Sequence, residues 1–347
     1  MRATLLSLAT LFALACSGPA PEAGPDAGSF ADAAALPDAG APATLYFVAI
    51  HNEPMNVPNG PALLAAAYPV LQQMVQEATE RHLKLTVMLS AQWADYIVAD
   101  AGRKAEVLGW KAQGHELAAH HHGIHHGNWD GYTDLSPSDA AAKRTAQGKT
   151  PETYHGTLAD YASHLHALDP GIKSGCVNDE GERSELPDAI VYDTCSGFTN
   201  HLAPGTREQD ASGEKGRNEY ANTGTWKGIA RTWLAHSQIT NQSKREAAQA
   251  AMSVQTGGVF GAVLHSSTAE ATQLYAFFDF LATLDPTAAH SRTLIEAIEQ
   301  RVLPTQALSD ELLNAVYTSV AGPGRCGDGV CDDVEKANPT LCPNDCP

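Results

Sequence analysis

Residues 114–133, GHELAAHHHGIHHGNWDGYT, hold six of the fifteen histidines of the chain. Imidazole is the commonest protein ligand for zinc-like metals, and two histidines four residues apart can reach one ion. His122 and His126 have this spacing, as do His121 and His125. The preceding HELAA is typical of a short buried strand, so the sequence predicts a metal site at the C-terminal end of a strand. The alternative is a histidine-rich surface loop that binds metal only incidentally.

Apolar runs of strand length alternate with helical patterns on both sides of this stretch. Strands that alternate with helices imply a parallel sheet, and about seven such units in roughly 275 residues favour a distorted (β/α) barrel over an open sheet. The barrel is predicted to span residues 44–322. The predicted strands are 45–50, 83–89, 115–119, 172–177, 189–194, 225–234 and 258–265, and the predicted helices include 62–82, 91–108, 241–254 and 267–284.

Three of the predicted strands end in residues that handle protons or metals. His51 and Glu53 follow the first strand, the histidine cluster follows the third, and His265 closes the last. Chemistry in such barrels gathers at the C-terminal ends of the strands, so we expect these side chains to meet in one site. The alternative for His265 is a core position, because a histidine at the end of an apolar strand is often simply buried.

The histidine stretch resembles the polysaccharide deacetylases, the NodB-homology carbohydrate esterases. Their motif reads Gly-His-Glu-aliphatic, two small residues, then His-x-x-x-His; Gly114-His115-Glu116-Leu117 matches its first half. His122 and His126 are similar to its second half, with His120 and His121 as two extra residues. Because His120 shares a strand face with His122, it is the reserve ligand. The strand that ends at His265 resembles the family's last motif.

The resemblance implies a metal-dependent hydrolase that removes acetyl groups from a cell-surface or extracellular polysaccharide. It implies one divalent metal, with zinc expected, bound by His122, His126 and Glu53, with His51 as base and His265 as general acid. The family's Thr-Phe-Asp-Asp-Gly is replaced here by the stretch from His51 to Glu53, so both of these residues could bind metal. Two alternatives therefore stay open: a catalytically silent carbohydrate-binding barrel, and a hydrolase of non-sugar amides.

Trp129, Asp130 and Tyr132 follow the histidines directly. Aromatic rings stack on the apolar faces of sugars, so this loop is predicted to contact the substrate. Ordinary packing of the loop is the alternative.

Residues 1–16 have the features of a bacterial secretion signal, with Arg2, an apolar run over 5–15 and then Cys16. The run, about eleven residues, is too short to span a bilayer. Ala13-Leu14-Ala15-Cys16 resembles a lipoprotein box, which would make Cys16 a lipidated N-terminus in the outer membrane or at the cell surface; ordinary cleavage is the alternative. Residues 17–43 are rich in Ala, Pro, Gly and Asp and are predicted to be a disordered linker.

Six cysteines remain when Cys16 is set aside, an even number that suits disulfides in an oxidising compartment. Cys176 and Cys195 belong to the barrel and are predicted to form one bridge. The tail, residues 323–347, is too short to bury a core and resembles the Cys-rich repeats of secreted bacterial proteins. Its acidic residues could hold calcium, although solvated loops or a four-thiolate zinc site are alternatives. The tail is predicted to hold two further bridges among Cys326, Cys331, Cys342 and Cys346.

The composition restricts the partners of the chain. A formal net charge of −18 argues against binding to a nucleic acid backbone, which needs clustered Lys and Arg. A hydrophobic content of 43% is sufficient for a full core. The expected partners are therefore a polysaccharide substrate and, only through the lipid anchor, a membrane.

Overall fold

The computed structural model describes residues 43–148, 152–178, 185–195 and 216–308. The predicted signal, almost all of the linker and the Cys-rich tail lie outside these residues. No helix among the described residues combines the length and the apolar character needed to cross a membrane.

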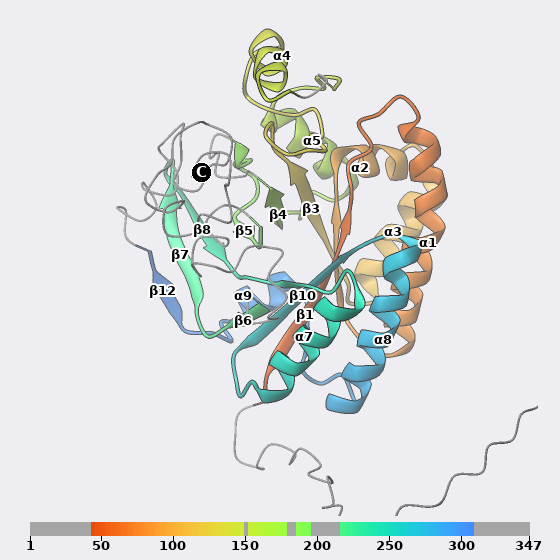
Figure 1. Ribbon diagram of the computed structural model, residues 1–347, viewed down its shortest axis with the longest axis vertical. Helices are drawn as coiled ribbons and strands as arrows, with labels where there is room; N and C mark the ends of the chain where they lie inside the picture. The colour runs from red at the N-terminus through yellow and green to blue at the C-terminus, as the bar shows by residue number, and fades with distance from the viewer. Residues whose placement is uncertain (1–42, 149–151, 179–184, 196–215, 309–347) are drawn as a thin grey trace, which may run out of the picture. The chain divides into compact units, whose positions relative to one another are not determined.

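One curled sheet forms the centre of the described chain (Figure 1), with the strand path β12-β7-β8-β5-β4-β3-β2-β1-β10-β6. From β8 to β10 all neighbouring strands on this path run parallel. The path ends at β12 and β6, so the predicted α/β barrel is confirmed in the form of an incomplete, curled one. Its parallel strands are β1 (Leu45–Asn52), β2 (Leu85–Leu89), β3 (Glu116–His122), β4 (Ser174–Asn178), β5 (Tyr192–Asp193), β8 (Ile229–Trp233) and β10 (Val259–His265).

The strand predicted within 225–234 is present as β8, and it is the second arm of a hairpin that was not predicted. β7 (Ala221–Trp226) pairs with β8 antiparallel, and only Lys227 and Gly228 connect them. Both connecting residues have positive φ, 50° and 78°, which is the backbone of the two-residue turns that suit twisted hairpins. The remaining short strands are β6 (Arg217–Asn218), β9 (Ser237–Gln238), β11 (Ser291–Arg292) and β12 (Thr305–Ala307).

The helix predicted over 91–108 is divided into α2 (Ala91–Val98) and α3 (Ala101–Ala112). Asp100 lies between them, and its carboxylate accepts a hydrogen bond from the backbone N–H of Arg103 at 2.9 Å, which caps the second helix. The other helices are α1 (Gly60–Glu80), α4 (Pro137–Ala146), α5 (Leu158–Leu168), α7 (Gln242–Val254), α8 (Thr268–Leu284) and α9 (Leu294–Glu299).

Alternation along the strands divides the core into two clusters. Tyr46, Val48 and Ile50 of β1 pack in the large cluster that the helices α1, α2, α5 and α8 cover. Phe47 and Ala49 belong to the smaller cluster on the inner side of the curl. Because side chains alternate between the two faces of a strand, the next odd position, His51, also lies on the inner side.

Glu116 closes the inner side at the N-terminal end of β3. Its carboxylate accepts hydrogen bonds from Thr86 and from the backbone N–H of Ile295, both at 3.0 Å, and from Ser174. Burial is the main cause that raises the pKa of Glu116. The Glu of the Gly-His-Glu motif therefore joins three strands to α9 instead of taking part in the site.

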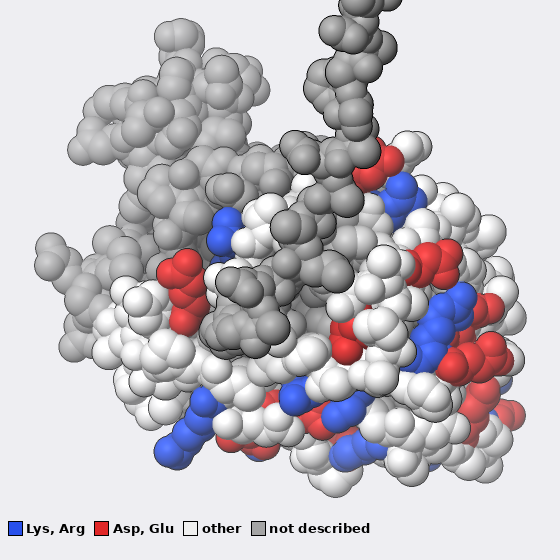
Figure 2. Space-filling model, turned by 90° about the horizontal axis from the view of Figure 1, so that it is seen from below, with Lys and Arg blue, Asp and Glu red and all other residues white. Residues whose placement is uncertain are grey.

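The surface seen from below carries charges of both signs. Acidic and basic side chains are intermixed over the coloured part of Figure 2, where no extended basic patch is visible on the described residues. Pairs such as Lys84 with Glu296, at 2.6 Å, account for some of this mixing.

Candidate metal centre

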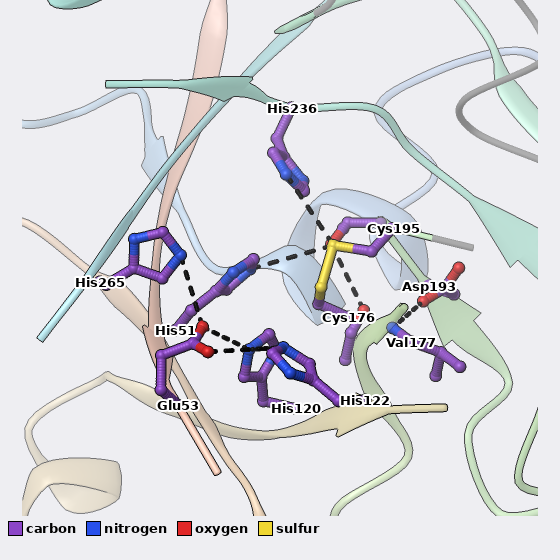
Figure 3. The surroundings of a disulfide bond; sticks show 12 residues. His51, Glu53, His120, His122, Cys176, Val177, Asp193, Cys195, His236 and His265 are labelled. Carbon is purple, nitrogen blue, oxygen red and sulfur yellow. Dashed lines mark hydrogen bonds and ion pairs between the residues drawn. A yellow bond between two sulfur atoms is a disulfide. The ribbon is translucent and has the colours of Figure 1, made fainter. Parts of the chain in front are cut away.

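The C-terminal ends of β1, β3 and β10 bring the expected residues together (Figure 3). In the register of the two parallel strands, His51 of β1 lies opposite His265 of β10. Glu53 follows β1 directly, and β3 lies one strand beyond β2 on the other side. Strands that are far apart in the sequence therefore supply one cluster, as expected from the polar residues at their C-terminal ends.

Three side chains of this cluster converge on one point. Nε2 of His120 lies 3.1 Å from Oε1 of Glu53 and 2.9 Å from Nε2 of His122. Nε2 of His122 lies 3.7 Å from the second oxygen of Glu53. His120 and His122 are two residues apart on β3, so they project from the same face of the strand. Two imidazole nitrogens and one carboxylate are the donor set of a zinc-like ion.

The tautomer of His122 suits a metal ligand. Nδ1 of His122 lies 2.8 Å from the carbonyl oxygen of Asn128, which can only accept, so Nδ1 carries the hydrogen. Nε2 is then left with its lone pair directed at His120 and Glu53, which is the usual arrangement of a metal-binding histidine. Burial is the main cause that keeps the pKa of His122 well below its ordinary value, so the ring is neutral.

Glu53 forms the open side of the group. The side chains of His120 and His122 are fully buried, whereas about a third of the Glu53 side chain is exposed. Burial alone would raise the pKa of Glu53, but the hydrogen bond from His120 and the charges of the neighbouring histidines outweigh it and lower the pKa. Asn128 donates to the second oxygen of Glu53 at 3.3 Å and to the carbonyl of Pro54 at 3.1 Å, which holds this carboxylate in place.

His126 lies outside this group of ligand atoms, and the reserve ligand His120 lies in it. The chain turns after His122, and the N–H of His126 donates to the carbonyl of Gly123 at 2.9 Å. Arg144 donates to the carbonyl of His126 at 2.6 Å and so fixes the turn. The ring of His126 contacts that of His122, with centroids 3.8 Å apart. The histidines occupy a strand and a turn, so the four-residue spacing does not place His126 in this group, and its role as a ligand stays a prediction.

His265 lies on the open side of the cluster, opposite Glu53. Its Nε2 lies 3.4 Å from Oε1 of Glu53, and its Nδ1 lies 3.0 Å from both carboxylate oxygens of Glu270. A carboxylate only accepts, so Nδ1 of His265 carries a hydrogen and Nε2 faces the site. About a third of the His265 side chain is exposed. His265 is therefore not an enclosed core residue, and its predicted role as general acid stays a prediction.

His51 lies behind His120, away from solvent. The two rings are stacked with centroids 4.2 Å apart, and only 2% of His51 is exposed. Burial, followed by the charges of the surrounding histidines, keeps the pKa of His51 well below its ordinary value. One of its nitrogens lies within 4.8 Å of ligand atoms of both Glu53 and His265. Its predicted role as base stays a prediction.

His121 points to the opposite face of β3. Its Nδ1 lies 2.8 Å from Asp130 and its Nε2 lies 3.8 Å from Glu185. Burial would lower the pKa of His121, but these two carboxylates raise it to about 10, so the ring is an imidazolium. Trp129, Asp130 and Tyr132 are at most 3% exposed, and Asp130 is bonded to His121. Since none of the three offers a surface in this conformation, their substrate role stays a prediction.

A cavity of about 930 Å³ is lined in part by Met55, two residues after Glu53, and by Gly127, which precedes Asn128. Leu64 and Tyr96 make another part of its wall apolar. The cavity has room for a group of substrate size.

The predicted bridge between Cys176 and Cys195 is confirmed. It joins Cys176, within β4, to Cys195, two residues after β5, and Figure 3 shows it beside the ring of His51. The four tail cysteines lie outside the described residues, so their pairing stays a prediction.

Three residues of the site were not predicted. Glu270 lies three residues after Ser267, in the first turn of the helix predicted over 267–284. Its carboxylate also accepts a hydrogen bond from Nδ1 of His265. Asn128 and His236 carry no motif, and only the folded chain places them beside Glu53 and Cys195. The only feature of the sequence that could have indicated a role for Asn128 is its place within the histidine-rich stretch.

The solved structures that resemble this chain are only distantly similar to it, as two examples show. None of the known protein families and none of the curated proteins matches this chain. A 4-α-glucanotransferase from Thermococcus litoralis superposes with a TM-score of 0.46 and 12% identity over 76% of this chain, which spans only 39% of that enzyme. A protein from Mycobacterium smegmatis assigned as a polysaccharide deacetylase has a TM-score of 0.41 and 10% identity over 77% of this chain and 98% of its own. Similarity at this level establishes neither family nor activity, so function is argued from the side chains.

Proposed function

We propose that the protein is a metal-dependent hydrolase that removes acetyl groups from a carbohydrate outside the cytoplasm. The convergence of Glu53, His120 and His122 at the strand ends, with His265 at 3.4 Å from Glu53, carries this proposal. The resemblance of the Gly-His-Glu stretch and of the last strand to polysaccharide deacetylases supports the substrate class. The secretion signal and Cys16 support a location at the outer membrane or cell surface.

A divalent ion bound here would polarise the acetyl carbonyl and lower the pKa of a bound water. His120, His122 and Glu53 would hold it, because their donor atoms already face one another. The burial of both histidines excludes bulk water from that side, whereas the exposed part of Glu53 leaves a side open to substrate. The cavity next to Met55 would accept the part of the substrate beyond the acetyl group.

His265 is the proton donor in this proposal. The carboxylate of Glu270 fixes Nδ1 of His265, so that only Nε2 faces the site. The hydrogen bond to Glu270 also keeps the ring oriented, as a general acid requires. His265 would protonate the amine or alcohol as it leaves.

His51 is the candidate base. Its ring is neutral because burial lowers its pKa, and a neutral imidazole can accept a proton. The nitrogen within 4.8 Å of Glu53 and His265 is in reach of a water molecule between them. The family's acidic pair is replaced in this chain, so the base must come from another residue type.

A catalytically silent carbohydrate-binding barrel is the second candidate, and Asn52 is the observation that favours it. Asn52 follows His51 in the stretch that replaces the family's acidic pair, and it is fully buried. Its side chain donates to the carbonyl of Met88 at 2.9 Å, so it is used within the sheet. A barrel with Asn52 in place of an acidic base could still bind a carbohydrate but no longer hydrolyse its acetyl group.

Acetate release by the purified protein tests the proposal. The metal-free full chain would be loaded with one equivalent of zinc and assayed on N-acetylated and O-acetylated oligosaccharides. We expect acetate only from the zinc-loaded protein, and loss of acetate release after His265→Ala. Sugar binding without acetate release, under any metal, would support the silent barrel instead. Acetate from a simple anilide but from no sugar would point to the non-sugar amide hydrolase.

A further inference from the structure

A second group of potential ligand atoms lies deeper in the barrel than the first. Sγ of Cys195 lies 3.9 Å from Nε2 of His236 and 4.0 Å from Nε2 of His51. The three residues come from three separate segments: the end of β5, the connection between β8 and β9, and β1. Figure 3 shows both imidazoles directed at the sulfur of Cys195.

The distances in this group are close to those of a metal site. Zinc bonds of about 2.3 Å to sulfur and 2.0–2.1 Å to nitrogen, at a tetrahedral angle, place sulfur and nitrogen about 3.6 Å apart. The observed separations of 3.9 and 4.0 Å exceed that value only slightly. All three ligand atoms lie within 4.8 Å of one another.

The group is also enclosed. The exposed fractions of Cys195, His236 and His51 are 3%, 1% and 2%. Enclosed sites with thiolate and imidazole ligands are typical of tightly bound zinc.

The disulfide between Cys195 and Cys176 prevents the sulfur of Cys195 from binding a metal as a thiolate. A dithiol reductant would transfer two electrons to the disulfide, so that the S–S bond breaks, both cysteines become thiols and the reductant closes its own disulfide. The thiol of Cys195 would then lose its proton to solvent as the sulfur binds the ion.

We propose that reduction of the Cys176–Cys195 disulfide creates a second metal site, formed by Cys195, His51 and His236, for a thiolate-preferring divalent ion such as zinc. The proposal does not rest on the hydrolase activity, because it uses none of Glu53, His120 and His122. In the oxidised protein the sulfur of Cys195 is held in the disulfide and is no thiolate ligand, so this group offers a metal only the nitrogens of His51 and His236. In the reduced protein His51 becomes a ligand and is withdrawn from any role as base.

Cobalt binding to the full chain tests this, because a thiolate bound to Co²⁺ gives a charge-transfer absorption that nitrogen and oxygen ligands do not give. Cys16 and the four tail cysteines would be changed to serine, so that only Cys176 and Cys195 contribute. The metal-free protein would be titrated with Co²⁺ before and after reduction by a phosphine under argon. We expect one additional equivalent of cobalt, with the charge-transfer band, in the reduced protein only.

Two matched variants in the same background decide which sulfur binds. Cys176→Ser frees the sulfur of Cys195, so it should show the band without any reductant. Cys195→Ser should never show it, and His236→Ala should weaken the cobalt affinity at least tenfold. A band that survives Cys195→Ser would overturn the proposal in favour of Cys176, whose sulfur lies within 4.8 Å of His51 and His120.

The remaining outcomes separate this proposal from the proposed function. Absence of the band in both the reduced protein and Cys176→Ser, with melting curves that show both to be folded, would also overturn it. Combination of Cys176→Ser with His120→Ala and His122→Ala removes the first centre. The charge-transfer band should persist in that variant, whether or not the parent protein releases acetate.

Discussion

Glu270 binds His265 twice: its carboxylate accepts from the backbone N–H at 2.7 Å and from ring Nδ1 at 3.0 Å. Ser267 caps the N-terminus of α8 by accepting from the N–H of Glu270, at 3.3 Å. The reciprocal contact of a capping box, from Glu270 back to Ser267, is replaced by the contacts with His265. A residue that would ordinarily stabilise a helix therefore orients the ring of His265, the proposed proton donor.

His265→Ala is expected to lower turnover on an N-acetyl substrate by about 10²–10⁴-fold, because proton delivery to a poor leaving group is lost. Hydrolysis of an activated aryl ester, whose leaving group needs no proton, should fall much less. The measurement is turnover on both substrates beside zinc content, which should be unchanged. Equal losses on both substrates would exclude His265 as general acid.

Glu270→Gln is expected to lower turnover by about 10- to 100-fold, because the neutral amide holds Nδ1 of His265 less firmly than the carboxylate does. The loss should be larger on an N-acetyl substrate than on an activated aryl ester, whose leaving group needs no proton. A variant that only loosened α8 would instead lower the melting temperature and reduce both activities equally. Ser267→Ala is the matched control for the helix cap alone.

His120→Ala should abolish binding of one zinc per chain, whereas His126→Ala should retain it. The reason is that His120 shares the donor group with Glu53 and His122, whereas the ring of His126 packs on that of His122 and accepts from the N–H of Asn128 at 3.1 Å. Zinc content after dialysis, with melting curves as a check on folding, distinguishes the two histidines. Retention of zinc by the first variant and loss by the second would restore the four-residue spacing as the ligand pattern.

The free energy of unfolding is expected to fall as the pH drops from about 6.5 to 4, because burial lowers the pKa of His115 to about 4. The unfolded chain gains a proton over this range that the folded chain cannot accept, so stability is present above pH 6.5 and is lost towards pH 4. The loss is on the order of 3 kcal/mol. Denaturant titrations at several pH values in this range should show that the free energy of unfolding changes less with pH in His115→Gln than in the parent protein. If the free energy of unfolding changed with pH equally in the variant and the parent, the prediction for His115 would be wrong.

Asp130→Asn is expected to destabilise the fold by about 3–5 kcal/mol, because it removes a partner of the buried His121 imidazolium. The raised pKa of His121, about 10, means that the stabilisation is full below pH 6.5 and is lost as the pH rises through 10. The alkaline loss of stability should therefore be smaller in the variant. Asp188→Asn, at a carboxylate with 78% exposure, is the control and should change stability by less than about 0.5 kcal/mol.

The parts of the fold that depend on local pattern could be predicted from the sequence. The apolar runs gave the central strands, and the alternation of side chains placed His120 on the face of His122. The hairpin at Lys227-Gly228 was missed, because two short polar strands lack a clear alternation. The break before α3 was also missed, since the pattern runs through Asp100 without interruption.

The partners of the site residues could be predicted less well than the residues themselves. Strand ends indicated Glu53 and His265, because parallel strands bring their C-terminal ends together. His236 stands at no strand end and Glu270 lies in a helix cap, so their contacts arise only when separate segments pack. His126 was preferred over His120 because the four-residue spacing assumes a helix, whereas β3 continues to His122.

The position of β1 in the sheet also affects how the chain folds. β1 is the first strand of the described chain, yet Leu45 pairs with Val259 of β10, close to its other end. Until β10 has been synthesised, one edge of an almost wholly buried apolar strand has no neighbour, and such edges promote aggregation. Pairing across so much intervening chain is slow to form, and β1 leads directly into Glu53. Late pairing of β1 with β10 therefore leaves an aggregation-prone edge exposed during synthesis, and it brings His265 opposite His51 only as the last of the parallel strands joins the sheet.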